Sequence, residues 1–329
     1  MENPRNSGFV ATAGEALIDL ISKSDGSYEA CLGGAVFNLT RALARQQVNT
    51  VYLNPLSGDR FGRMLRNALV QDGVHLAREV PVPEVTSLAI VGVSAQGHPD
   101  YAFYREKVAD RAISAQSLVE GCAAQAVDMV CTGCLALAPQ DEAVYLPWLR
   151  ERIAAGNTVV VDVNLRPGPM PDLARYRRNV LAAASLAHIV KASDEDLAHL
   201  GLPGADPIDK ARRLLENSHA SMLALTLGPD GACLLARAAD GIQVWQAREV
   251  EPVEVVDTVG AGDCFLAGLL AALRALGWTP ARTLDAGAAS GVLAHAVASA
   301  SLCVMERGCV PPSWHSANAR AGRVQVTQP

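Results

Sequence analysis

The chain has 329 residues, of which 50% are hydrophobic and 19% are charged, with a formal net charge of -6. This length fits one large α/β domain with a small appendage. The acidic balance, without any run of Lys and Arg, argues against a nucleic-acid-binding surface. A small anionic ligand bound by backbone N–H groups remains compatible with a negative chain.

The apolar stretches of the chain do not predict a membrane span. Residues 1–21 lack the basic region and long apolar run of a signal peptide. The stretch 265–278, "FLAGLLAALRALGW", is interrupted by an arginine and is too short to cross a bilayer. We therefore predict a soluble, cytoplasmic protein with no membrane partner.

The eight cysteines predict no disulfide framework. Most of them lie inside apolar runs, and cysteine is commonly a buried residue. A chain of this size does not need disulfides for stability, so we expect reduced thiols. Cys131 and Cys134 form a C-x-x-C pair, which can be a redox motif or half of a zinc site. No second pair follows at zinc spacing, so a structural role is favoured.

The first third of the chain predicts two helices and the strands of a small β appendage. Residues 9–21 are expected to form one strand, followed by a polar, turn-rich segment. Apolar residues at helical spacing begin at Ala35, and a second helix is expected from Asp59 to a stop at Gly73. Residues 86–105 contain two strand-like runs with no helix between them, so we expect them to be antiparallel.

The remainder of the chain alternates between short apolar strands and helix-like segments. The predicted strands are 127–133, 157–167, 187–193 and 221–228. This alternation is typical of a doubly wound α/β domain, with a mostly parallel sheet and helices on both faces. A hairpin and two helices rich in small residues follow. The expected division is one domain over 1–315, a small β sheet within it from about 18–32 and 86–105, and a C-terminal tail at 316–329.

Polar or glycine-rich residues follow several predicted strands, at the sheet edge where ligands collect in such folds. They are Asp162, Asn164 and Arg166, then Asp194–Asp196, then Gly228–Gly231, and finally residues 258–263. Each group alone is better explained as a turn or a helix cap. Their common placement predicts one shared site.

The loop "TVGAGD", residues 258–263, carries the strongest chemical signal. Gly260 and Gly262 let the backbone approach a ligand closely and expose N–H groups where a helix begins. Such amides suit the negative charge that develops in phosphoryl transfer. Asp263 then lies beside an anion site with a carboxylate that can accept a proton, although a plain helix cap is the simpler alternative. The chain has neither a Walker A motif nor a G-x-G-x-x-G after its first strand, which disfavours P-loop and dinucleotide-binding enzymes.

The segment "DTVGAGD", Asp257–Asp263, resembles the D-T-x-G-A-G-D signature of the ribokinase-like (PfkB) carbohydrate kinases. Other segments resemble motifs of the same family, in the same order and along nearly the whole chain: "GEALIDL", "LGGAVFNLTRALAR", "LSGDRFGRML", "DVNLRP", "VKASDEDL" and "TLGPDGA". Within the family, the chain is most similar to bacterial fructokinases. The resemblance implies a ribokinase-like fold in which the small β sheet acts as a lid.

The resemblance also implies a role for each matching residue. Asp263 would be the general base, with an anion hole formed by the amides of Gly260, Ala261, Gly262 and Asp263 itself. The implied sugar-binding residues are Asp19, Gly33, Gly34, Asn38, Arg105, Asp162, Asn164 and Arg166. The implied ATP-binding residues are Thr226, Gly228, Gly231, Ala288 and Gly308. The implied metal-binding residues are Asp257 for a monovalent cation and, for Mg²⁺, Glu195 or Asp196.

One motif departs from the family pattern. The family's Asn-x-x-Glu motif, which supports Mg²⁺, here reads Ser193-Asp-Glu-Asp196. The choice between Glu195 and Asp196 therefore stays open. Two of the sugar assignments also have simpler alternatives, since Arg105 can be a solvated charge on a strand and Arg166 can pair with a neighbouring carboxylate.

We therefore predict an ATP-dependent sugar kinase that uses Mg²⁺ and, as many relatives do, a monovalent cation such as K⁺. The predicted reaction is phosphorylation of a primary hydroxyl of fructose. The alternatives are a 2-keto-3-deoxygluconate kinase, a ribokinase or nucleoside-type kinase, and a non-catalytic sugar sensor, which would not need Asp263. The predicted partner is a small sugar, with no nucleic acid. In relatives the lid often pairs two subunits, so a homodimer through the lid is a further expectation.

Overall fold

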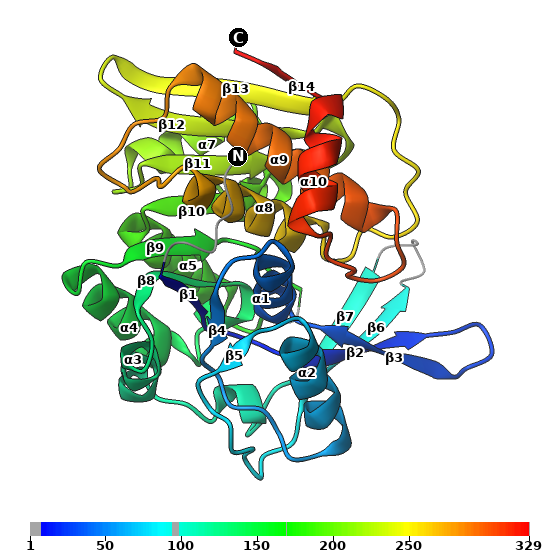
Figure 1. Ribbon diagram of the computed structural model, residues 1–329. Coiled ribbons are helices and arrows are strands. Elements are labelled where there is room, and N and C mark those ends of the chain that lie inside the picture. Colours follow the sequence, from blue (N-terminus) through cyan, green and yellow to red (C-terminus); the bar gives the residue numbers. More distant parts are fainter. Residues whose placement is uncertain (1–7, 94–98, 169, 329) are drawn as a thin grey trace.

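The computed structural model describes residues 8–93, 99–168 and 170–328, which form two sheets and the helices around them (Figure 1). The larger sheet has ten strands: β1 Phe9–Thr12, β4 Thr50–Tyr52, β5 His75–Leu76, β8 Val127–Gly133, β9 Thr158–Asp162, β10 Ile189–Ser193, β11 Met222–Thr226, β12 Ala232–Ala238, β13 Gly241–Glu249 and β14 Val324–Thr327. The smaller sheet has four strands: β2 Leu17–Ser22, β3 Tyr28–Gly33, β6 Ser87–Val93 and β7 Pro99–Tyr104.

The larger sheet is parallel over most of its width. Its strand order is β14-β13-β12-β11-β10-β9-β8-β1-β4-β5, and neighbours from β11 to β5 pair in parallel. The strands β12, β13 and β14 pair antiparallel at the other end. Central strands such as β9 carry a continuous valine run, Val159 to Val161, because both faces of the sheet are covered. The predicted doubly wound α/β fold is confirmed.

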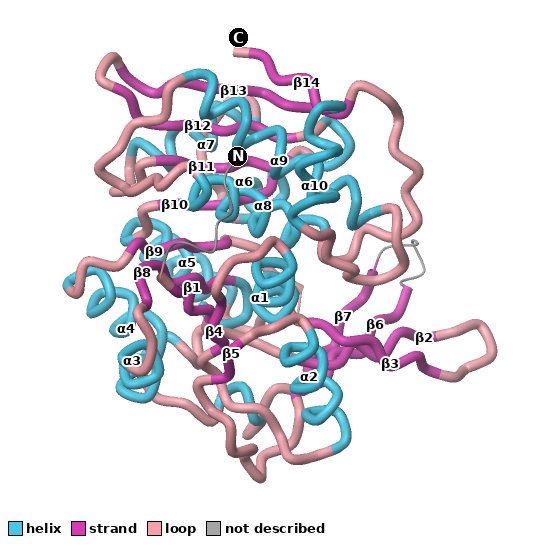
Figure 2. The backbone as a smooth tube through the Cα atoms, in the orientation of Figure 1, coloured by secondary structure: helices cyan, strands magenta, loops and turns pink. Residues whose placement is uncertain are grey.

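Helices cover both faces of this sheet (Figure 2). The core on one face, which includes Trp148, Val161 and Leu215, is closed by α3 Ala115–Ala123, α4 Glu142–Ala154, α5 Leu173–Leu186, α6 Asp194–His199 and α7 Pro207–Glu216. The core on the other face, which includes Leu43, Phe265 and Trp314, is closed by α1 Ala35–Arg45, α8 Ala261–Ala275, α9 Ala286–Val304 and α10 Trp314–Arg320. The helix α2, Arg60–Gln71, packs with α1 over the start of the smaller sheet.

One helix among the described residues, α9, is long and apolar enough to cross a membrane by length and composition. However, 61% of the most apolar 18-residue stretch of this helix is buried inside the fold. It packs along α8 and against β13. Both α8 and α9 are rich in alanine and glycine, so their backbones can approach closely. We conclude that α9 is a core helix.

The prediction of one strand over residues 9–21 is wrong, because this segment belongs to both sheets. β1 lies between β8 and β4 in the larger sheet, while β2 pairs with β3 and β6 in the smaller one. The chain changes sheet at Gly14 to Ala16. The buried carboxylate of Glu15 accepts a hydrogen bond from the Ala35 amide at 3.0 Å, which fixes this crossing against the start of α1.

The expected C-terminal tail at 316–329 is also corrected. Residues of this segment complete α10 and then form β14, which pairs antiparallel with β13. The side chains of Val324 and Val326 pack against the core beside α9. The small β sheet expected from about 18–32 and 86–105 is present, and its four strands have the order β3-β2-β6-β7. The predicted turn within 86–105 falls partly on residues 94–98, outside the described residues.

Candidate active site

The loop before α8 has a backbone conformation that favours glycine. Gly260 is the N-cap of α8, with φ 79° and ψ 0° in the left-handed region. A Cβ atom on Gly260 would lie 2.3 Å from Cys309 Sγ, so a larger residue would also clash. This loop therefore requires glycine for two independent reasons.

The first amides of α8 form a potential anion site. The Ala261 amide donates to Thr258 O at 3.2 Å. Over the described ranges of the chain, the amides of Gly262 and Asp263 have no acceptor. Unpaired N–H groups at the start of a helix attract negative charge, since the helix dipole adds to their own. The Gly260 amide likewise has no acceptor among the described residues, so three of the four amides predicted for the anion hole are available as donors.

Asp263 lies at this helix start with its carboxylate buried and only 6% of the residue exposed. Asn38 on α1 donates from Nδ2 to Asp263 Oδ2 at 3.0 Å. Burial raises the pKa of Asp263 to about 7; Asp162 adds to the rise, and Lys191 opposes it. A buried carboxylate with a pKa near neutrality is suited to accept a proton during catalysis.

Lys191 on β10 is a candidate residue that the sequence analysis missed. Its Nζ lies 3.0 Å from Asp162 Oδ1, and only 4% of the residue is exposed. A Cβ atom on Gly262 would lie 3.0 Å from this Nζ, so the ammonium group lies beside the unpaired amides. Burial acts to lower the pKa of Lys191, but Asp162, Asp196 and Asp263 outweigh it and raise the pKa. A lysine inside the apolar run "IVKAS" was the available signal, because a buried lysine needs a partner.

The smaller sheet contributes Asp19 and two glycines. Burial raises the pKa of Asp19, on β2, to about 6, and Arg166 opposes this shift. A Cβ atom on Gly33 would lie 2.0 Å from Asp19 Oδ2, so only glycine fits beside this carboxylate. Gly34 is the N-cap of α1, with φ 103°, and its carbonyl accepts a hydrogen bond from the Asn38 amide at 2.9 Å. The end of β3 and the start of α1 thus carry these predicted residues together.

The segment after β9 carries Arg166, whose charge acts on Asp19 of the smaller sheet and on Asp263 of α8. Asn164 has φ 36°, a left-handed conformation that asparagine tolerates, and its Nδ2 donates to Asp162 Oδ2 at 3.3 Å. The positive charge of Arg166 opposes the rise that burial causes in the pKa of both Asp19 and Asp263. The guanidinium group therefore lies near both carboxylates. The structure brings Asp19, Asn38, Arg166 and Asp263 into one neighbourhood.

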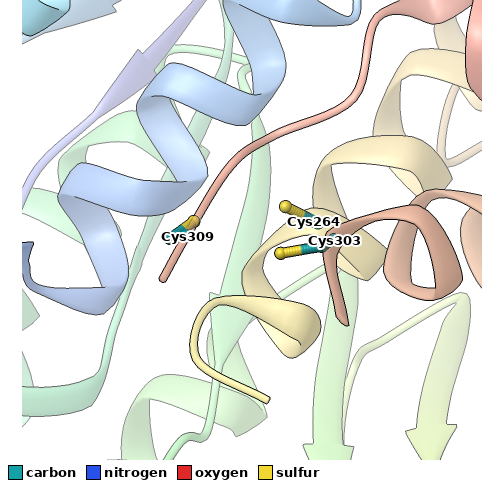
Figure 3. Close-up of side chains that lie close together, drawn as sticks. All are labelled: Cys264, Cys303 and Cys309. Carbon is teal, nitrogen blue, oxygen red and sulfur yellow. The ribbon is translucent and has the colours of Figure 1, made fainter. Parts of the chain in front are cut away.

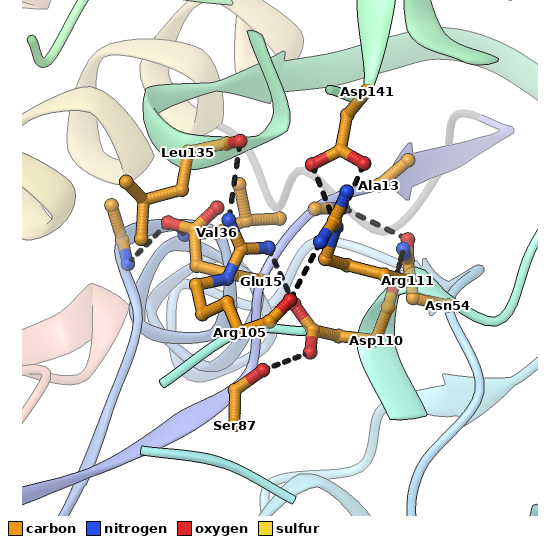
Figure 4. A network of polar contacts seen from close by, with 12 residues as sticks. Ala13, Glu15, Val36, Asn54, Ser87, Arg105, Asp110, Arg111, Leu135 and Asp141 are labelled. Carbon is orange, nitrogen blue, oxygen red and sulfur yellow. Dashed lines mark hydrogen bonds and ion pairs between the residues drawn. The ribbon is translucent and has the colours of Figure 1, made fainter. Parts of the chain in front are cut away.

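Arg105 belongs to a buried polar network and not to an open pocket (Figure 4). Its Nη2 lies 2.7 Å from Asp110 Oδ2, and its Nη1 donates to Leu135 O at 3.3 Å. Asp110 also accepts a hydrogen bond from Ser87 Oγ on β6. The charge of Arg105 also favours the ionised form of Glu15, which lies where the chain crosses between the two sheets. The positive charge expected at the sugar is thus already matched by two carboxylates.

The predicted phosphate-binding residues lie between β11 and β12. Thr226 is the last residue of β11. Gly228 and Gly231 bound the turn that follows, both with positive φ. A Cβ atom on Gly231 would lie 2.1 Å from Ala247 O on β13, so this position also needs glycine.

Asp257 connects the loop before α8 to the loop after α9. Its Oδ1 accepts from the Val259 amide at 3.0 Å, and its Oδ2 accepts from the Gly308 amide at 2.9 Å. Ala288, in the first turn of α9, donates its amide to Asp285 Oδ1 at 2.8 Å, so this amide serves the helix cap.

Glu195 and Asp196, the two candidate carboxylates for supporting Mg²⁺, differ sharply in their surroundings. Asp196 is buried, and its oxygens accept from the amides of Ser193 at 2.8 Å and Leu165 at 2.7 Å. It forms a capping box with Ser193 at the start of α6. Glu195 is exposed at the same helix start. Glu195 is therefore the more accessible oxygen donor of the two.

Comparison with known proteins is consistent with this geometry. A family model described as "pfkB family carbohydrate kinase" matches residues 7–315. The chain is 32% identical over 275 residues to a fructokinase of Rhizobium leguminosarum bv. trifolii, covering 81% of this chain and 80% of that protein. It is 32% identical over 292 residues to the aminoimidazole riboside kinase of Salmonella typhimurium, covering 88% and 86%. The fold is similar to that of the fructokinase with bound ATP from Xylella fastidiosa, with a TM-score of 0.82, 25% identity, and coverage of 95% and 98%.

Proposed function

The chain belongs to the pfkB family of carbohydrate kinases, and from this membership we propose that it is an ATP-dependent fructokinase with Asp263 as its general base. Membership makes the chain a phosphotransferase with an alcohol group as acceptor. The assignment of Asp263 as the general base rests on its buried carboxylate, which has a pKa raised to about 7 and lies beside the unpaired amides at the start of α8.

The proposed step needs one proton acceptor and one centre of positive charge. Asn38 holds Asp263 Oδ2, which leaves Oδ1 to take the proton from the sugar hydroxyl. The hydroxyl oxygen then forms a bond to the γ-phosphorus of ATP, and the bond to the bridging oxygen breaks, so that its electron pair leaves with ADP. The amides of Gly262 and Asp263 and the ammonium group of Lys191 stabilise the phosphoryl oxygens during transfer.

The sugar side is built for neutral hydroxyl groups. Asp19 is an acceptor for hydroxyls, and Gly33 and Gly34 allow a sugar to approach the backbone closely. Arg166 favours the ionised forms of Asp19 and Asp263, since it opposes the rise that burial causes in the pKa of each. We assign Arg105 to holding the end of β7 in place through Asp110, and not to direct contact with the sugar.

The nucleotide side is proposed from the matching family positions. Thr226, Gly228 and Gly231 would lie along the ATP phosphates, with Ala288 and Gly308 near the adenine. Mg²⁺ would supply charge neutralisation on those phosphates, and the exposed Glu195 fits a supporting role because its oxygens are accessible. Asp257 fits a loop that responds to a monovalent cation, because its carboxylate ties together the loops at Val259 and Gly308.

The smaller sheet is proposed as a lid over the sugar, because it carries Asp19 and Gly33 beside the start of α1. Its two outer strands, β3 and β7, expose Tyr28 and Tyr104, which are 54% and 59% accessible. Exposed aromatic side chains are enriched at protein interfaces. This pattern supports the pairing of two subunits through the lid.

The pH profile follows from the raised pKa of Asp263. The base must be ionised, and its pKa is about 7, so kcat/KM should fall tenfold for each pH unit below about 7. Asp19, with a pKa of about 6, should steepen this loss at lower pH. Initial rates across the acid and neutral range test this, with Asp206→Asn, at the N-cap of α7, as the control. A profile that stays flat from neutral to acid pH would contradict the role of Asp263.

Substrate preference is the second consequence. 2-Keto-3-deoxygluconate carries a carboxylate that needs an unmatched cation, whereas Arg105 is already paired and Asp19 repels anions. We expect kcat/KM for fructose to exceed that for the acid by at least ~10-fold, about 1.4 kcal/mol. A panel of fructose, ribose, 2-keto-3-deoxygluconate and aminoimidazole riboside at fixed ATP measures this.

The panel also separates the second candidate function, an aminoimidazole riboside kinase. That candidate is supported by the 32% identity to such an enzyme over 88% of this chain. A preference for the riboside over fructose would favour it. A preference for the acid would instead show that one of the two arginines, Arg105 or Arg166, is available to a ligand. Either result would replace fructose as substrate and leave the sugar kinase assignment standing.

A further inference from the structure

Three cysteines from separate segments lie close together beside the loop that precedes α8. Cys264 follows Asp263 directly in α8, Cys303 lies near the end of α9, and Cys309 lies in the loop after α9. Their sulfur atoms all lie within 4.8 Å of one another, and all three thiols are free (Figure 3). Within the described residues, this is the only group of potential metal ligands gathered so closely.

The surroundings of the cluster suit a soft ion better than a hard one. Cys264 is 1% exposed and Cys303 is fully buried, both inside the apolar core on the α8 side of the sheet. Cys309 is half-buried and adjoins the exposed residues Met305–Arg307 and Val310, which gives an ion a route from solvent. Thiolates select soft metals such as Zn²⁺ and Cu⁺.

The distances are close to those of a bound metal. Metal–sulfur bonds of ~2.3 Å in a planar three-sulfur site separate the sulfurs by about 4 Å. The sulfurs therefore need to move inward by less than about 1 Å. Cys309 can supply this movement, because its loop lies between α9 and α10 outside any helix.

We propose that Cys264, Cys303 and Cys309 form a binding site for a thiophilic d¹⁰ metal ion, held by three thiolates. Each thiol releases its proton to solvent as its sulfur binds the ion, so a divalent ion leaves the site with one net negative charge. The proposal does not depend on which sugar the enzyme phosphorylates.

Occupancy of this site acts on the anion loop. A Cβ atom on Gly260 would lie 2.3 Å from Cys309 Sγ, and Cys303 Sγ contacts Val259 O at 3.5 Å. Cys264 is the next residue after Asp263. Pulling the three sulfurs together therefore shifts the backbone on both sides of the unpaired amides, and the metal inhibits phosphoryl transfer.

The test is a titration of the reduced, full-length protein with Cd²⁺ alone, followed by sulfur-to-cadmium charge-transfer absorption. We expect saturation at one equivalent per chain, with proton release detectable in weak buffer. Cys303→Ala should weaken binding by at least ~100-fold, the upper end of what loss of a supporting residue does at a metal site. Cys122→Ala, which removes a buried thiol outside the cluster, is the matched control and should bind normally.

Two further outcomes keep the test decisive. If Cys303→Ala fails to fold, Cys309→Ser, at a half-buried loop position, takes its place and should show the same loss. Cd²⁺ should inhibit the kinase reversibly, with activity restored by a chelator, and Cys309→Ser should resist inhibition. Absorption that is absent, or that is unchanged in both cluster variants, would show that the three cysteines only pack.

Discussion

Asp263→Asn should lower kcat by at least ~10²-fold, because an amide keeps the shape of the carboxylate but cannot accept the hydroxyl proton. The hydrogen bond with Asn38 can persist through the amide oxygen, so the position of the side chain should change little. Binding of ATP and sugar, measured by calorimetry, should stay near normal. The fold should not suffer, because burial disfavours the charged form of Asp263.

The linkage between pH and stability gives a second readout for the same variant. Because burial raises the pKa of Asp263 from 3.8 to about 7, the folded state binds this proton more tightly than the unfolded state. The contribution of Asp263 to stability therefore falls as pH rises from about 4 to about 7. Asp263→Asn should be at least as stable as the parent at alkaline pH. Asp206→Asn, at the exposed N-cap of α7, is the matched control. Near-normal turnover in Asp263→Asn would remove this residue from the mechanism.

Lys191→Met should lower kcat by ~10²- to 10³-fold, as loss of one preorganised donor to a transition-state anion does. The same change leaves the buried Asp162 without its ion-pair partner, 3.0 Å away. Breaking a buried pair in this way destabilises a fold by roughly 3–5 kcal/mol. Activity and stability therefore need to be separated.

The double variant Lys191→Met/Asp162→Asn makes that separation. It removes both buried charges, so the free energy of unfolding, measured by denaturant titration, should recover most of its loss. The kcat value should not recover, because no ammonium group remains beside Gly262. Lys210→Met on α7 is the control for loss of a lysine away from the site. A double variant that regains parental kcat would show that Lys191 serves only to neutralise Asp162.

The parallel strands are predictable from the sequence because each is a short apolar run with both faces buried. Residues 127–133 and 187–193 form β8 and β10 close to the expected bounds. The start of α8 just before Asp263 is predictable for a similar reason, since the glycines at 260 and 262 act locally. These features depend on residues that are adjacent in the chain.

The errors in the fold arise from contacts between distant residues. Residues 9–21 read as one strand because their apolar pattern is continuous, yet Glu15 accepts a hydrogen bond from the amide of Ala35, twenty residues away. The C-terminal segment reads as a tail because β14 gains its stability only by pairing with β13. Neither Ala35, the partner of Glu15, nor β13, the partner of β14, can be identified from the local sequence pattern.

The roles of the two buried cations could not be separated from the sequence. Arg105 and Lys191 each sit in strand-like segments, and each finds a buried aspartate in the fold. Asp110 draws Arg105 into the network at the junction of the two sheets, whereas Asp162 places Lys191 beside the start of α8. Which cation faces the ligand is therefore decided by tertiary pairing and not by residue type.

The most direct test of the account is a single-turnover experiment with excess enzyme and γ-labelled ATP, with and without fructose. The account predicts that the parent transfers the label to a primary hydroxyl of fructose, and that Asp263→Asn forms the same product at least ~10²-fold more slowly. Equal transfer rates in the two proteins, or label that appears only in orthophosphate when fructose is present, would contradict it.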